Sequence, residues 1–126
     1  MSKNPSVLHI IDSLEPGGAE RVAIMMANLF SGKRHKVGLM YFIHTSINLL
    51  DTIINDVQVY QFDRKGKFNI LQKQEFQKIT MEYDLLHVHL KHNLRYVWFM
   101  KLFSKRIPTV VFHDHGFTFF KRLDLK

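Results

Sequence analysis

The sequence predicts an α/β fold in which a parallel sheet carries helices on both faces. Short apolar runs, of the kind found in strands buried on both faces, alternate along the chain with stretches of helical periodicity. A Pro-Gly-Gly turn joins the first apolar run to the first helical stretch. Strands that alternate with helices form right-handed crossovers, and these crossovers place the strands parallel in one sheet.

The first strand and helix meet at the glycine turn. The apolar run over residues 7–11 predicts a buried strand, which Pro16, Gly17 and Gly18 end. A helix is expected from Ala19, because apolar residues then recur at three- and four-residue steps. Its inward stripe is expected to consist of Ala19, Val22, Ala23, Met26, Leu29 and Phe30.

That turn is a candidate anion site, because the first N–H groups of a helix lack partners and carry the positive end of its dipole. Glycine at positions 17 and 18 lets a phosphate or carboxylate approach the backbone. The same glycines would also suit a tight turn that binds nothing.

Further apolar runs predict four more strands, at residues 37–43, 57–62, 84–89 and 109–112. The run at 57–62 alternates, which favours a place nearer a sheet edge. Three more helices are expected between or after these strands, with the apolar faces Ile47, Leu50, Ile53 and Ile54; Phe68, Leu71, Phe76 and Ile79; and Tyr96, Val97, Phe99, Met100 and Phe103.

Histidines follow the last two expected strands. In a Rossmann-like sheet, strand one lies between strands two and four, and ligands bind outside the carboxyl ends where the order reverses. The crevice there would be lined by residues 13–18, 89–92 and 113–116. Its side chains would include His89, Lys91, His92, His113, Asp114 and His115.

The motifs of common nucleotide and metal sites are missing. A dinucleotide site would need G-x-G-x-x-G and an acid after the second strand, whereas the chain has PGGAER and His44-Thr45. The histidines show no HExxH or other tight ligand spacing, so no metal site is expected. His87 and His89 lie on one side of a strand, where backbone carbonyls could equally hold them.

Length and composition favour one cytoplasmic domain, residues 1–126. The chain has no cysteine, which excludes disulfides and thiolate metal sites. We expect no secretory leader, and no apolar run approaches the ~20 residues that cross a bilayer. The formal net charge of +7 predicts an anionic partner such as nucleic acid, a phospholipid headgroup or a sugar nucleotide.

Three segments in this order resemble a known family over nearly the whole chain. They are VLHIIDSLEPGGAERVAIMMANLFSGKRHKVGLMYF, YDLLHVHLKHN and TVVFHDHG. They resemble the opening, the fourth strand and the fifth strand of family 4 glycosyltransferases, whose two-domain fold is called GT-B. The resemblance implies that this chain is the amino-terminal, acceptor-side half of such an enzyme.

The resemblance also implies roles for individual residues. Gly17 and Gly18 would approach the donor diphosphate through backbone amides, and the catalytic-site residue His113 would contact the donor sugar. His89 would line the same cleft, with a structural role equally open. Such enzymes transfer a sugar from a nucleotide sugar with retention of configuration and need no bound metal or other cofactor. Many use lipid-linked acceptors, in polysaccharide or glycolipid synthesis, at the cytoplasmic face of a membrane.

The family's carboxyl-terminal half has no counterpart in the chain. That half holds the nucleotide and a pair of glutamates with seven residues between them, a spacing that no two glutamates here have. A separate donor domain is therefore expected as a partner. Catalysis requires donor and acceptor in one closed cleft, so this chain alone is expected to be inactive.

The stretch 91–106 offers a different function. Basic residues lie opposite its core-facing arc, with Leu94, Trp98 and Leu102 among them; they are Lys91, Arg95, Lys101, Lys105 and Arg106. Such a face suits an anionic membrane, although packing on a neighbouring chain is equally open. The alternative hypothesis is a non-catalytic α/β module that binds a membrane or partner. Nucleic acid is disfavoured, because the aromatic residues fall at buried periodic positions.

Overall fold

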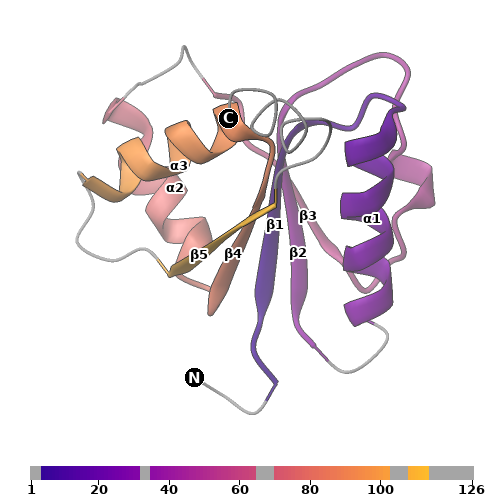
Figure 1. The fold of residues 1–126 in the computed structure, drawn as a ribbon, viewed down its shortest axis with the longest axis horizontal. Coiled ribbons are helices and arrows are strands. Elements are labelled where there is room, and N and C mark those ends of the chain that lie inside the picture. Colours follow the sequence, from indigo (N-terminus) through magenta and orange to yellow (C-terminus); the bar gives the residue numbers. More distant parts are fainter. Residues whose placement is uncertain (1–3, 32–34, 65–69, 103–107, 114–126) are drawn as a thin grey trace, which may run out of the picture.

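A computed structural model describes residues 4–31, 35–64, 70–102 and 108–113. It shows a sheet with α1 on one face and α2 and α3 on the other (Figure 1). The elements are β1 (Val7–Ser13), α1 (Gly18–Ser31), β2 (Val37–Ile43), β3 (Gln58–Gln61), α2 (Lys73–Thr80), β4 (Leu85–His89), α3 (Lys91–Leu102) and β5 (Thr109–His113). Short 3₁₀ turns occur at Leu50–Thr52 and Ile70–Gln72.

The sheet has five strands in the order β3-β2-β1-β4-β5, all parallel. The α/β fold expected from the sequence is confirmed, and the architecture is Rossmann-like. Strand β1 lies between β2 and β4, and β3 lies at an edge. The order therefore reverses beside β1, which places the β1–α1 turn and the ends of β4 and β5 at one edge of the sheet.

Alternate residues of β1 reach two separate cores. Leu8 and Ile10 are fully buried among the side chains of α2 and α3, including Phe76 and Tyr96. Ile11 is fully buried on the opposite face in a second core, which α1 covers. A strand with apolar contacts on both faces reads as a near-continuous apolar run, which explains why β1 was evident from the sequence.

The inward stripe of α1 was predicted partly wrong. Ala23 is buried as expected, but Leu29 is 55% exposed and Phe30 is 38% exposed. The buried positions are Ala23, Ile24, Ala27 and Ser31. Small residues on this face allow α1 to lie close to β1 and β2. The apolar arc of α1 is wider than that contact, so the choice of stripe within it could not be made from periodicity alone.

Two further helix predictions were also partly wrong. Residues 45–54 form no regular helix but a short 3₁₀ turn at Leu50–Thr52, and Ile47 is 72% exposed. Ile54 is exposed as well, while Leu50 and Ile53 pack against the α1-side core. In the next helical segment Phe76 is buried as expected. Leu71 lies in the 3₁₀ turn before α2 and is 88% exposed, since a tighter turn rotates it off the α2 stripe.

Helix α3 has the expected two faces. Tyr96, Val97 and Met100 are buried, while Trp98 and Leu102 are each 60% exposed. The helix begins at Lys91, directly after Leu90, so Lys91 and His92 belong to the helix. Among the predicted residues, Phe68, Phe103, Lys105, Arg106 and the segment 114–116 lie outside the described part of the chain. Across the described residues, no helix combines the length and apolarity needed to cross a membrane.

Candidate functional site

The β1–α1 turn presents free backbone donors at the sheet edge. The N–H of Arg21 donates to the carbonyl of Gly17 over 3.1 Å, which makes Gly17 the capping residue directly before α1. The N–H groups of Gly18, Ala19 and Glu20 precede this bond and have no partner within the helix. A Cβ at Gly18 would meet nothing within 4 Å, so a ligand could reach its backbone. Neither Gly17 nor Gly18 has a φ in the left-handed region, so close approach is the property that glycine provides here.

Glu20 is a competitor for any anion at this turn. A Cβ at Gly17 would lie 2.5 Å from Oε1 of Glu20, so the carboxylate bends back over the start of its own helix. A negative side chain in the first turn is favoured by the helix dipole. An anionic ligand would therefore have to displace the flexible Glu20 side chain.

The ends of β4 and β5 are joined by a strained residue. Leu90 has a φ of 74°, which is rare for a residue with a branched side chain and costs of order 1 kcal/mol. Its N–H donates to the carbonyl of His113 over 3.2 Å, and its carbonyl accepts from the N–H of Leu94. This conformation lets α3 begin directly after β4 and fixes the backbone of His113 next to it. His113 is half-buried at the end of β5, opposite His89 in the register.

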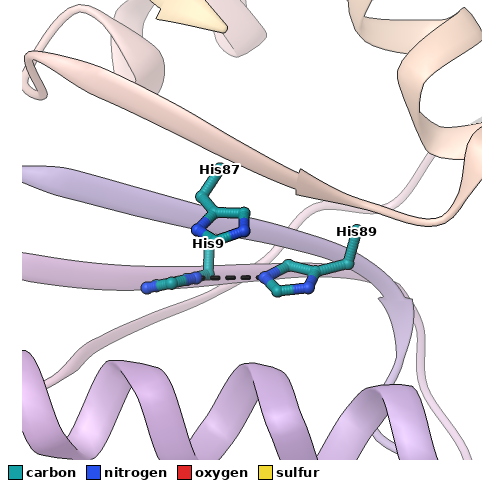
Figure 2. A group of neighbouring side chains, drawn as sticks. All are labelled: His9, His87 and His89. Carbon is teal, nitrogen blue, oxygen red and sulfur yellow. Dashed lines mark hydrogen bonds between the residues drawn. The ribbon is translucent and has the colours of Figure 1, made fainter. Parts of the chain in front are cut away.

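Behind this edge lies a cluster of imidazoles on the α1 side of the sheet, which we call the histidine cluster: His9, His87, His89 and His113. Figure 2 shows that the rings of His9, His87 and His89 gather between the sheet and α1. Nδ1 of His9 lies 3.1 Å from Nε2 of His89 in a hydrogen bond. The rings of His87 and His89 stack with centroids 4.3 Å apart. His113 follows from β5, with its ring centroid 5.3 Å from that of His89.

His9 is the member that the sequence reasoning missed. It is fully buried in β1, directly opposite His87 of β4. Burial, together with smaller contributions from the neighbouring His87 and His113, lowers the pKa of His9 from 6.5 to about 3. His9 is therefore neutral at physiological pH. The available signal was a single polar residue within the apolar run of β1.

His89 lies in the interior, where it contacts other residues of the protein. It is fully buried, its ring bonds to His9, and its carbonyl accepts from Nδ2 of Asn93 over 2.8 Å. These contacts favour the structural role that the sequence left open. His89 and His113 each end a strand at this edge, and His113 is the one that is only half-buried.

His92, which the sequence placed at the crevice, lies near the start of α3, and its Nε2 is 3.4 Å from Oδ2 of Asp12 in β1. Arg64 was not among the predicted residues. Arg64 follows β3 and places its guanidinium 4.7 Å from the ring centre of Tyr96 and 5.2 Å from that of Phe42. Its Nη1 is buried and has no hydrogen-bond partner among the described residues. Arg64 thus packs its guanidinium against two aromatic rings of the core on the α2 and α3 side.

The structure therefore places the predicted turn and the predicted histidine at the same edge of the sheet. Gly17 and Gly18 open α1 at the carboxyl edge, and His113 ends β5 at the same edge. Lys91 begins α3 directly after the end of β4, while Arg95, Trp98 and Lys101 follow along that helix. Lys105 lies outside the described residues.

Comparison with known proteins adds no assignment. No protein-family model matches the chain, and no curated protein matches its sequence significantly. The function must be argued from the residues and their placement.

Proposed function

We propose that this chain is the amino-terminal, acceptor-side domain of a retaining glycosyltransferase that uses a nucleotide-sugar donor. One observation carries the proposal. The GGAER turn opens a helix at the same sheet edge where His113 ends a strand, on a parallel sheet whose order reverses beside the turn. Ligands of open α/β sheets bind at this position. The segments that carry the resemblance to family 4 glycosyltransferases supply these same residues.

Each part of the edge has a role in the proposed reaction. The amides of Gly18 and Ala19 bind the donor diphosphate, because they have no partner within the helix and lie at the positive end of α1. His113 contacts the donor sugar near the reacting carbon. A second domain that binds the nucleotide is required to complete the cleft, and the acceptor is a sugar or a lipid-linked sugar at the cytoplasmic face of a membrane.

We expect Gly18→Val to weaken binding of a nucleoside diphosphate at least about tenfold, the size of one or two lost charge-assisted hydrogen bonds. The valine side chain would block access to the helix start without meeting any neighbour within the fold. Glu20→Gln is expected to strengthen binding, because it removes the competing charge. Calorimetric titration of the chain and its variants with UDP and GDP measures both effects.

Lys78→Gln is the control for this titration, since Lys78 is exposed and lies in the last turn of α2, on the face of the sheet opposite α1 (Figure 1). Unchanged affinity in Gly18→Val would contradict a phosphate site at the turn. Unchanged affinity in Glu20→Gln would contradict the competition that we infer between Glu20 and the ligand.

A second function is favoured by α3, either on its own as a non-catalytic module or as the membrane contact of the enzyme. A shallow groove of about 410 Å³ runs along the exposed side of this helix, with Trp98 and Leu102 among its apolar lining. Lys91 and Arg95 line the same groove, and Lys101 follows in the last turn. Large apolar side chains between cations are suited to the headgroup region of an anionic bilayer.

We expect anionic phosphatidylserine vesicles to shift the fluorescence of Trp98 to the blue, and neutral phosphatidylcholine vesicles to leave it unchanged. Trp98 is the single tryptophan of the chain, so the signal reports this face alone. Lys91→Glu with Arg95→Glu should weaken vesicle binding at least about tenfold, since each cation near such a surface contributes ~1 kcal/mol. Lys73→Glu with Lys78→Glu on α2 is the charge-matched control. Equal losses in the two double variants would contradict a specific membrane face on α3.

A further inference from the structure

The histidine cluster has the layout of a metal site. His9 comes from β1 and His87 and His89 from β4, with His9 and His87 opposite each other in the parallel register. One ring nitrogen from each of the three residues lies within 4.8 Å of the others. Two histidines two residues apart on one strand, with a third on the neighbouring strand, place three imidazoles on one face of a sheet.

We propose that His9, His87 and His89 bind a divalent transition-metal ion of the zinc class. An all-imidazole set suits Zn²⁺, Cu²⁺ or Ni²⁺, whereas Mg²⁺ and Ca²⁺ prefer oxygen ligands. No carboxylate belongs to this group of three ligands. The site lies outside the proposed sugar-transfer chemistry, which needs no metal, and it is independent of that proposal.

The distances require small side-chain rotations. Two nitrogens bound tetrahedrally to one Zn²⁺ at ~2.0–2.1 Å lie roughly 3.3 Å apart. The nitrogens of His9 and His89 are already 3.1 Å apart in the hydrogen bond that the ion would replace. The His87 nitrogen lies within 4.8 Å of both, so its ring must turn from its stacked position toward them. His113, with its ring centroid 5.5 Å from that of His87, is the nearest side chain for a fourth position.

The hydrogen bond between His9 and His89 marks the position that an ion would take. Neutral imidazole is the form that coordinates a metal. An ion bound at Nδ1 of His9 would replace the bond to His89, and the proton of the neutral ring would then lie on Nε2, which is buried and has no hydrogen-bond partner among the described residues.

An entry path is present. A groove of about 290 Å³ lies between α1 and the exposed side of β4 and β5, and His9 and His87 line it. Its other walls include Met26 and Phe30 of α1, which are not among the buried residues of this helix. His35 lines the same groove and could relay an ion to the cluster. Once bound, the ion would link β1 to β4 and raise the stability of the fold, because it binds the folded state alone.

The test is a titration of the full chain, without a histidine tag and stripped by chelator, with Co²⁺ and then Zn²⁺. We expect one Co²⁺ per chain with the intense visible absorption of a tetrahedral site, displaced by Zn²⁺, and a rise in the melting temperature with Zn²⁺. His87→Gln and His89→Gln should each weaken binding at least about 100-fold, since even the outer partners of metal ligands contribute 10–100-fold. His44→Gln should leave binding unchanged.

A second measurement keeps the test decisive where a variant unfolds. Long-range ¹H–¹⁵N spectra of wild-type imidazoles should show the ring nitrogens of His9, His87 and His89 moving together as Zn²⁺ is added. The proposal is overturned by absence of binding at millimolar Zn²⁺. It is equally overturned by binding that shifts other histidines while these three stay unmoved, or that survives in both cluster variants.

Discussion

Gly38→Val is expected to unfold much of the protein, with a loss of about 3 kcal/mol or more in the free energy of unfolding. Gly38 lies in β2, where a Cβ would meet the hydroxyl of Tyr83, with Cζ of Tyr83 at 2.7 Å and Cδ1 of Leu8 at 2.9 Å. The Tyr83 hydroxyl is held 2.9 Å from that of Tyr60, so the ring has little freedom to withdraw. Overpacking of this kind costs typically 1–3 kcal/mol, and valine adds more volume than alanine.

Urea denaturation of wild type, Gly38→Ala and Gly38→Val measures this loss. Gly38→Ala should lose about 1–3 kcal/mol, in the range of overpacked core sites. Gly18→Ala is the matched control, because a Cβ there meets no atom within 4 Å and the change should be neutral within about 0.5 kcal/mol. Wild-type stability in Gly38→Val would contradict the close packing of Tyr83 on β2.

The second large effect is a loss of stability in acid that depends on His9. Burial holds the pKa of His9 at about 3 in the folded protein, against 6.5 for the free side chain. The stability contributed by neutral His9 is complete above pH 6.5. Below pH 6.5 the imidazole of His9 is protonated in the unfolded chain but stays neutral in the folded protein. The free energy of unfolding therefore falls by about 1.4 kcal/mol per pH unit down to pH 3.

The groups that face His9 make this loss specific. His87 and His89 approach from β4 and His113 from β5, while α1 contributes the apolar Met26 to the groove beside it. Positive charge on any of these imidazoles would oppose protonation of His9. None of the groups named here is an acid that could stabilise the imidazolium.

Denaturation curves at pH 7, 6 and 5 in the presence of a chelator, for wild type and His9→Leu, test this expectation. Wild type should lose about 1.4 kcal/mol more than His9→Leu for each pH unit below 6. Leucine has a similar size and no proton to gain. Parallel stability profiles for the two proteins between pH 6 and 5 would contradict a strongly depressed pKa at His9.

The strands and their order were predictable for physical reasons. β1 and β2 are buried on both faces, so their apolar runs were continuous, and the alternation of strands with helices left few topologies. Edge strand β3 was recognised from its alternating pattern. The inward faces of α1 and of residues 45–54 were harder, because both segments have apolar residues around much of their circumference.

The candidate site was predictable in part. Gly17, Gly18 and His113 could be assigned to the sheet edge, because the positions of strand ends follow from the strand order. The histidine cluster could not be found from the sequence. His9 and His87 are far apart in the chain, and the register that places them opposite each other depends on tertiary pairing. Arg64 was missed for the same reason, since its contacts with Phe42 and Tyr96 join three distant segments.

The central claim is that the GGAER turn and His113 form one ligand edge for a nucleotide sugar. The most direct measurement is a heteronuclear NMR titration of the chain with nucleoside diphosphates and nucleotide sugars. The account predicts weak, saturable shifts at the amides of Gly17, Gly18 and Ala19 and at His113, which disappear in Gly18→Val. A turn that stays silent at millimolar ligand would contradict the claim, and a response of Trp98 to anionic vesicles in the same preparation would then identify the chain as a membrane-binding module.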